Sequence, residues 1–158
     1  MTVLELPEEV YQLIAERARR LGTSVEKLVI DAVASLLDPS MRVELYLRLQ
    51  EKLLRDAEEL NSKGDLVQAS EKYWGAVSSL LNAVGERENL PNYTHRDLKE
   101  IAIHLTEKEG DKEYTRLLSS AETLHANHHH NFLGKTSYDA HREDALRLIE
   151  RLKRYLGA

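Results

Sequence analysis

The segment SKGDLVQASEKYWGAVSSLLNAV, residues 62–84, sets the architecture of the chain. Near its start, Gly64 and Asp65 form the kind of pair that ends one helix and caps the next. Residues at helical spacing then follow one face: Leu66, Ala69, Tyr73, Ala76, Val77, Leu80, Leu81 and Val84. The preceding residues, about 41–63, also have a helical pattern. The segment therefore predicts a tight hairpin of two helices.

Two shorter helices are expected ahead of this hairpin. The first ends at Gly22, and the TSVE sequence that follows has the pattern of a capping box, with Thr23 as the cap. The sequence DPS at residues 38–40 interrupts the helical pattern before the longer helices begin. We therefore expect an N-terminal segment of residues 1–38 and a main body of residues 41–158.

Further helices are expected in the main body after the hairpin. Thr94 is expected to cap the next one, with Asp97 as its partner, and breaks at Gly110 and Gly134 separate two more. The prediction is an all-α protein with a four- or five-helix up-down bundle, preceded by a short strand and two helices.

Composition limits the classes of function. The chain has 158 residues, 42% of them hydrophobic and 31% charged, enough for one substantial core. The absence of cysteine excludes disulfides and cysteine-ligated zinc. Since no long apolar run or leader is seen, we expect no membrane association and a cytoplasmic location. The formal net charge of -5 argues against a general nucleic-acid coat.

Residues 2–37, TVLELPEEVYQLIAERARRLGTSVEKLVIDAVASLL, resemble a ribbon-helix-helix unit. The resemblance implies a homodimer in which two strands pair, with outward strand side chains that enter the DNA major groove. Alternation makes Val3 and Glu5 the outward pair, and neither suits phosphate or a base edge. Residues 1–38 carry four basic and seven acidic side chains. Dimerisation is therefore favoured over DNA binding.

Three segments of the main body occur in a specific order: GDLVQASEKYWGAV (64–77), THRDL (94–98) and SAETLHANHHHNFL (120–133). Together they resemble the archaeal PaREP family, whose fold is similar to the HEPN helical bundle. The resemblance implies such a bundle over about residues 41–156. It also implies a link to RNA, because many HEPN proteins are metal-independent ribonucleases in which an arginine precedes a histidine with four to six residues between them.

That arginine-histidine motif is not intact. Arg116 lies nine residues before His125, and seven residues separate Arg96 from His104. Two functions follow from the resemblance. One is a non-catalytic or weakly catalytic module that binds RNA or a nucleotide, and the other is a ribonuclease with an arginine from elsewhere in the bundle or from a dimer mate. The expected ligand-binding residues are His95, Arg96, His125, Asn127 and His129, with His125 and Arg96 as the catalytic candidates.

The histidines also allow a metal hypothesis. Glu122, His125 and His129 share one helical face, which would suit a single ion. A dinuclear site would need a second Glu-x-x-His motif, and the other histidines lack it. We therefore expect no bound metal and no cofactor.

The simpler interpretation is structural. In it, His125 continues the apolar row of Leu118, Ala121 and Phe132 and makes one buried hydrogen bond. Trp74 is expected to pack in the core, with a stacking platform as its alternative role.

Overall fold

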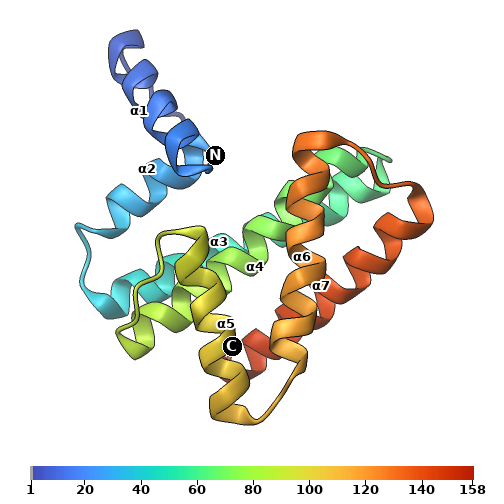
Figure 1. Cartoon of the computed structure of the whole chain (residues 1–158). Helices are drawn as coiled ribbons and strands as arrows, with labels where there is room; N and C mark the ends of the chain where they lie inside the picture. The colour runs from blue at the N-terminus through green and yellow to red at the C-terminus, as the bar shows by residue number, and fades with distance from the viewer. Residues whose placement is uncertain (1) are drawn as a thin grey trace. The chain divides into compact units, whose positions relative to one another are not determined.

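The computed structural model describes residues 2–158, and all of the regular structure in this range is helical (Figure 1). It falls into two units, Met1–Asp38 and Pro39–Ala158. The helices are α1 (Glu8–Leu21), α2 (Val25–Ala34), α3 (Pro39–Ser62), α4 (Leu66–Glu88), α5 (His95–Glu109), α6 (Glu113–His130) and α7 (Lys135–Leu156).

The first unit contains α1 and α2, which are joined through Gly22 in the left-handed conformation. The cap of α2 is Ser24, whose Oγ accepts a hydrogen bond from the Lys27 backbone N–H at 3.0 Å, so the prediction of Thr23 was wrong. Thr23 still belongs to the end of α1, because its own N–H donates to the Ala18 carbonyl. Ser24, which follows Thr23, is therefore the first residue that is free to cap the next helix.

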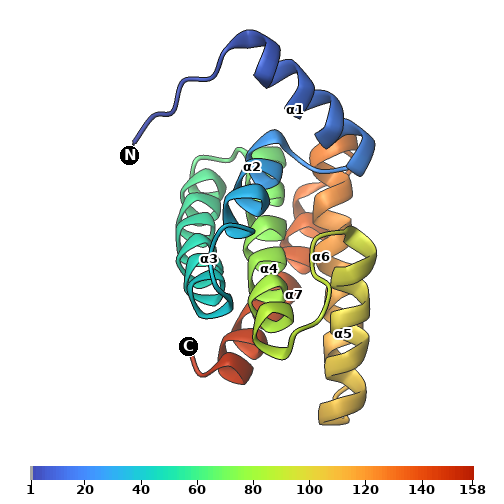
Figure 2. The ribbon, with the colours of Figure 1, turned by 90° about the vertical axis from the view of Figure 1, so that its left-hand side faces the viewer.

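No strand forms in residues 2–7, which run as an extended segment ahead of α1 (Figure 2). A strand requires a neighbour that accepts and donates its backbone hydrogen bonds. The ribbon-helix-helix interpretation places that neighbour in a second copy of the chain, so the strand stays a prediction about a dimer.

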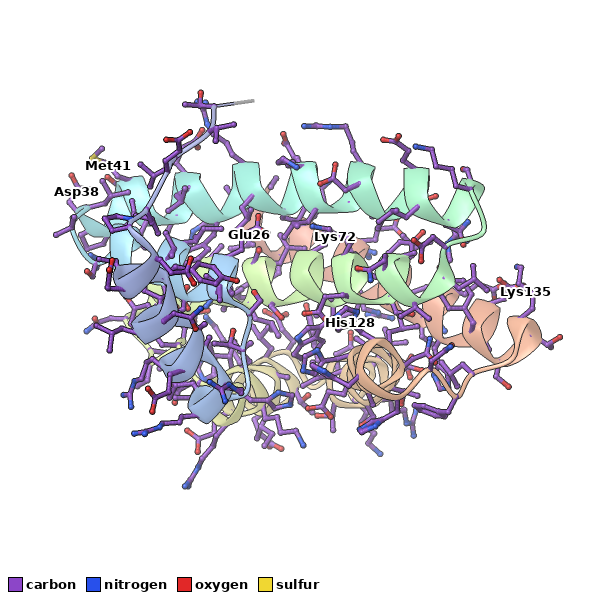
Figure 3. The ribbon with its side chains drawn as sticks, turned by 90° about the horizontal axis from the view of Figure 1, so that it is seen from above. Glu26, Asp38, Met41, Lys72, His128 and Lys135 are labelled. Carbon is purple, nitrogen blue, oxygen red and sulfur yellow. The ribbon has the colours of Figure 1, made fainter. Side chains whose placement is uncertain are left out.

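The second unit is built around α4. This helix forms the expected hairpin with α3, and the two lie side by side (Figure 3). It also contacts α5, α6 and α7. The Asp65 side chain caps α4 by accepting from the Gln68 N–H at 3.2 Å, which confirms that part of the prediction. The start of α3 is Pro39 rather than Met41, in keeping with the preference of proline for the first helical turn.

From Tyr73 to Gly85 every side of α4 is buried except for Gly75, which is half-buried. The sequence predicted a single apolar face, but this helix is surrounded by four others. Small polar side chains make this close packing feasible. Ser79 Oγ, for example, donates to the Gly75 carbonyl within the same helix, so its hydroxyl is satisfied without a partner from another helix.

The ends of α5 and α6 bring their polar residues towards α4. Thr94 and Asp97 form the predicted capping box at the start of α5. The last residue of α6 is His130, and Asn131 follows in the left-handed conformation. None of the helices described in residues 2–158 combines the length and the apolar character needed to cross a membrane.

Candidate functional site

Several polar side chains from α4, α5 and α6 gather around the tryptophan of α4. We call this group the histidine cluster: Glu71, Trp74, His95, Lys99, Glu122, His125 and His129.

Trp74 is the base of the cluster and is only 7% exposed. The His95 ring stacks against its indole with the centroids 5.3 Å apart, and the His125 ring lies at the same distance with a larger tilt. The two imidazole centroids are 6.1 Å from each other. The indole therefore holds two histidines from different helices side by side, so Trp74 both packs in the core and serves as a platform.

A carboxylate fixes the orientation of each imidazole. His95 Nε2 lies 2.7 Å from a Glu122 oxygen, and His125 Nδ1 lies 2.9 Å from a Glu71 oxygen. Each ring thus has one nitrogen engaged, and within residues 2–158 its other nitrogen has no protein partner. A histidine held in this way has a defined tautomer when neutral and presents its remaining nitrogen to a ligand.

The cluster opens to solvent on its α5 side. The His95 side chain is 44% exposed, whereas that of His125 is 17% exposed. Lys99 Nζ lies 3.3 Å from Glu122, which places a cation at the exposed edge. His129 meets the His125 ring edge-on at 4.8 Å, and partial burial followed by the charge of His125 lowers the pKa of His129.

Two of the five expected ligand-binding residues lie apart from this group. Arg96 has a highly exposed side chain and pairs with Glu100 on its own helix at 2.9 Å. Asn127 is buried and all of its hydrogen bonds are internal: it donates to Ser70 Oγ and accepts from the backbone after α6. The structure therefore brings together His95, His125 and His129 but neither Arg96 nor Asn127.

The apolar row that His125 was expected to continue is present only in part. Leu118 and Ala121 are buried, but Phe132 is 56% exposed because α6 ends before it. His128 lies on the side of α6 towards α4 with its Nδ1 buried and unpartnered, and His130 is exposed (Figure 3).

The single-ion arrangement is absent as well. Glu122 bonds to His95 on α5 rather than to His125 on its own helix. Over residues 2–158 no three His, Asp or Glu side chains are arranged to hold a metal ion.

Sequence reasoning missed Glu71 and Lys99. Glu71 lies three positions before Trp74 and is followed by Lys72, which is equally charged and half-buried, so no pattern in the sequence distinguishes Glu71. Lys99 follows His95 by four residues, so the two share a helical face.

A second group of residues resembles a hydrolase triad only in composition. Ser120 Oγ lies 2.7 Å from both His141 Nδ1 and an Asp144 oxygen. The serine therefore joins the other two side chains and directs its single proton to Asp144. In a nucleophilic triad the histidine stands between the serine and the carboxylate, so this group acts as a link between α6 and α7.

Comparisons with known proteins identify the family of this chain. No curated protein matches it. A crystal structure of a protein from Sulfolobus solfataricus has 28% sequence identity and a TM-score of 0.61, with 68% of this chain and 96% of that chain covered. Residues 45–149 match the model of the archaeal PaREP1/PaREP8 family. Because residues 45–149 make up more than half of this chain, the chain belongs to the archaeal PaREP1/PaREP8 family.

Proposed function

We propose that this protein is an RNA- or nucleotide-binding module with a HEPN-like bundle, and that its ligand binds at the histidine cluster. The observation that carries the proposal is the pair formed by His95 and His125 on Trp74. Two oriented imidazoles with free ring nitrogens are able to hydrogen-bond a phosphate or a base edge.

The surroundings of the pair support the same class of ligand. His95 is the first residue of α5, so the positive end of the helix dipole lies at the cluster. Lys99, which is half-exposed and paired with Glu122, adds a cation at the rim. The partly exposed His95 ring also offers an aromatic face, and such faces stack nucleic-acid bases with little sequence preference.

The ribonuclease alternative needs an arginine at this place. Arg96 pairs with Glu100, and Arg116 pairs with Glu113 at 3.1 Å, so neither side chain is directed to the cluster. That alternative therefore requires an arginine from a dimer mate. DNA binding through residues 2–37 has no supporting observation, since Val3 and Glu5 are exposed but unsuited to reading bases.

Trp74 supplies a direct test because it is the only tryptophan of the chain. AMP and a mixed-sequence RNA oligonucleotide are titrated while its fluorescence is followed. We expect saturable changes in wild type and at least tenfold weaker binding in His95→Ala and His125→Ala. His130→Ala is the matched control, because it removes an exposed imidazole outside the cluster. Equal affinity in all four proteins would refute the proposed site.

A further inference from the structure

We infer that the histidine cluster hydrolyses a small phosphodiester, with nucleoside 2′,3′-cyclic phosphates as the substrate class and His95 and His125 as its base and acid. This inference depends on the proposed nucleotide binding at the same cluster.

The starting point is the geometry of the two imidazoles. Displacement at phosphorus requires one group that takes a proton from the attacking oxygen and another that gives a proton to the leaving oxygen, on roughly opposite sides. The ring centroids are 6.1 Å apart. Since a catalytic group works within about 2.6–3.2 Å of the proton it transfers, two rings at this spacing are both able to reach one phosphoryl group.

Each histidine also has a carboxylate behind it. Glu122 holds His95 through Nε2, and Glu71 holds His125 through Nδ1. A carboxylate in this position orients the ring and stabilises the imidazolium that forms when the other nitrogen accepts a proton. Glu71 and Glu122 are thus positioning residues.

Electrostatics favour a small substrate over a long RNA strand. The chain carries a net charge of -5, and three of the four arginines of α7 are already paired with carboxylates: Arg142 with Glu58, Arg147 with Glu113 and Arg151 with Asp111. A polymer gains its affinity from several phosphates neutralised in a row. Among the described residues, Lys99 is the lysine or arginine in contact with the cluster, and it is itself paired with Glu122, so the cluster offers at most one such cation to a phosphate.

The proton transfers follow from the exposure of the two rings. His95, at 44% exposed, takes a proton from a water molecule as that water attacks phosphorus. A P–O bond to one ribose oxygen breaks, and His125, at 17% exposed, gives that oxygen its proton. The product is a nucleoside 2′- or 3′-phosphate, one water is consumed, and no electrons are transferred. Solvent then returns both imidazoles to their starting protonation states.

The rate is expected to rise and then fall with pH, because one imidazole must be neutral and the other protonated. The charged groups that face the pair are Glu71 on α4, Lys99 on α5, and Glu122 and His129 on α6. Glu122→Gln should therefore shift the limb of the pH-rate profile that belongs to His95, and Glu71→Gln the limb that belongs to His125. Loss of a purely structural contact would instead lower the rate equally at every pH.

The first experiment follows the hydrolysis of adenosine 2′,3′-cyclic phosphate by ³¹P NMR. EDTA is present to inhibit contaminating metal-dependent phosphodiesterases. We expect conversion to AMP isomers, with a loss of about 10²–10⁴-fold in both His95→Asn and His125→Asn. His130→Asn, purified in the same way, should match wild type. His95→Asn changes a partly exposed residue at a helix start, and a thermal unfolding curve of each variant checks that it is folded.

A second substrate separates the two roles. A nucleoside p-nitrophenyl phosphodiester has a leaving group that needs no proton. His125→Asn should regain most of its activity on this substrate, whereas His95→Asn should stay inactive. Equal losses on both substrates in both variants would overturn the assignment of acid and base.

The remaining outcomes are also decisive. Binding seen by Trp74 fluorescence without any hydrolysis would overturn the inference and leave the proposed function intact. A wild-type protein that neither binds nor hydrolyses these nucleotides would refute the proposed function as well. Faster cleavage of an RNA oligonucleotide than of the cyclic phosphate would overturn the assignment of a small substrate and favour a ribonuclease.

Discussion

Asn127 holds the end of α6 from inside the protein. Its Oδ1 accepts hydrogen bonds from the backbone N–H groups of Phe132 and Leu133, at 3.0 and 2.9 Å, and its Nδ2 donates to Ser70 Oγ at 3.1 Å. The residue is almost completely buried. The side chain therefore satisfies donors that water is poorly placed to reach, and it links α6 to α4.

Asn127→Ala should lower the free energy of unfolding by about 2–3 kcal/mol, because two backbone donors and one hydroxyl lose their partner. Urea denaturation measures this loss. Asn131→Gly is the control, since Asn131 has a φ of 46° and glycine adopts that conformation without strain. Equal destabilisation by both changes would show that the region responds to any substitution rather than to the lost hydrogen bonds.

His125 combines a structural contact with its proposed role. His125→Ala removes the bond to Glu71 and the ring contact with Trp74, so we expect it to cost about 1–3 kcal/mol of stability. A triple alanine variant at residues 128–130 should cost less, because within residues 2–158 none of these three imidazoles has a protein hydrogen-bond partner. Thermal unfolding of the two variants side by side tests the difference, and a larger loss in the triple variant would contradict it.

Single residues also mark the limit of sequence reasoning. Helical spacing placed Glu122 near His125, since both lie on α6 and Glu122 is three positions before His125. Glu122 instead reaches across to His95. Spacing describes neighbours on one helix, whereas partners on another helix depend on the packing angle and depth, which the sequence does not display. Glu71 was missed for the same reason.

Among the elements, α4 is packed most tightly where it meets the loop before α5. A Cβ added at Gly85 would lie 2.6 Å from Asn92 Cβ, closer than real atoms approach. Asn92 is itself fixed, because it is buried and donates to Glu86 and the Leu90 carbonyl. Glycine is thus needed here for close approach rather than for an unusual backbone angle.

We expect Gly85→Ala to destabilise the protein by about 1–3 kcal/mol through overpacking, in spite of a better helix propensity. Gly75→Ala in the same helix is the matched control. Its Cβ would meet only the end of the Leu53 side chain at 3.1 Å, which is able to move, so this change should be neutral or slightly stabilising. The midpoints of urea unfolding compare the two, and similar losses would argue against the clash.

A network at Glu88, the last residue of α4, joins this helix to α5 and α7. Glu88 accepts hydrogen bonds from Lys108 and Tyr155, and His104 lies 3.1 Å from the same carboxylate. Burial on its own would raise the pKa of Glu88, but these three partners outweigh it and lower that pKa to about 2. The ionised carboxylate is therefore the form that stabilises the fold.

This lowered pKa predicts how stability depends on pH. The contribution of Glu88 is complete above its ordinary value of 4.5 and is lost as the pH falls from 4.5 through about 2. Glu88→Gln should reduce stability at neutral pH and flatten the decline across this acidic window. Glu107→Gln changes an exposed carboxylate on α5 and should preserve the wild-type slope. Parallel acid-unfolding curves for wild type and Glu88→Gln would contradict the prediction.

Helix ends were predicted well where one residue controls them. Asp65 and Thr94 cap the helices that the sequence assigned to them, because each supplies its oxygen to an N–H three residues later. The cap of α2 was misplaced by one residue, since Thr23 donates its backbone N–H to the preceding helix. Local chemistry defines a cap unless two helix ends compete for the same short linker.

For the whole molecule, the distribution of exposed apolar side chains is uneven. Of the thirteen large hydrophobic residues that are exposed among residues 2–158, nine lie within residues 2–38, among them Val3, Leu4, Leu13 and Leu36 at 69–84% exposed. That segment is less than a quarter of the chain, and the backbone of residues 2–7 there is extended without a strand partner. Exposed apolar side chains in this number are the basis on which we propose an interaction site in residues 2–38.

We expect the occupant to be a second copy of the same segment. An unpaired apolar strand is able to pair with its own symmetry mate, and a two-fold arrangement buries identical patches against each other. Sedimentation at micromolar concentration should then give twice the chain mass of 18.1 kDa. Leu4→Glu combined with Leu13→Glu should shift the protein to a monomer, because each copy would carry two carboxylates into the contact.

The control for this prediction is Ile103→Glu, which changes a side chain 53% exposed on α5, outside the N-terminal unit. It should remain dimeric. A wild-type protein that sediments as a monomer would contradict the homodimer. A dimer that survives the double glutamate variant would place its interface in residues 39–158, and the ribbon-helix-helix interpretation of residues 2–37 would then lose its physical basis, since that interpretation rests on the need of this segment for a mate.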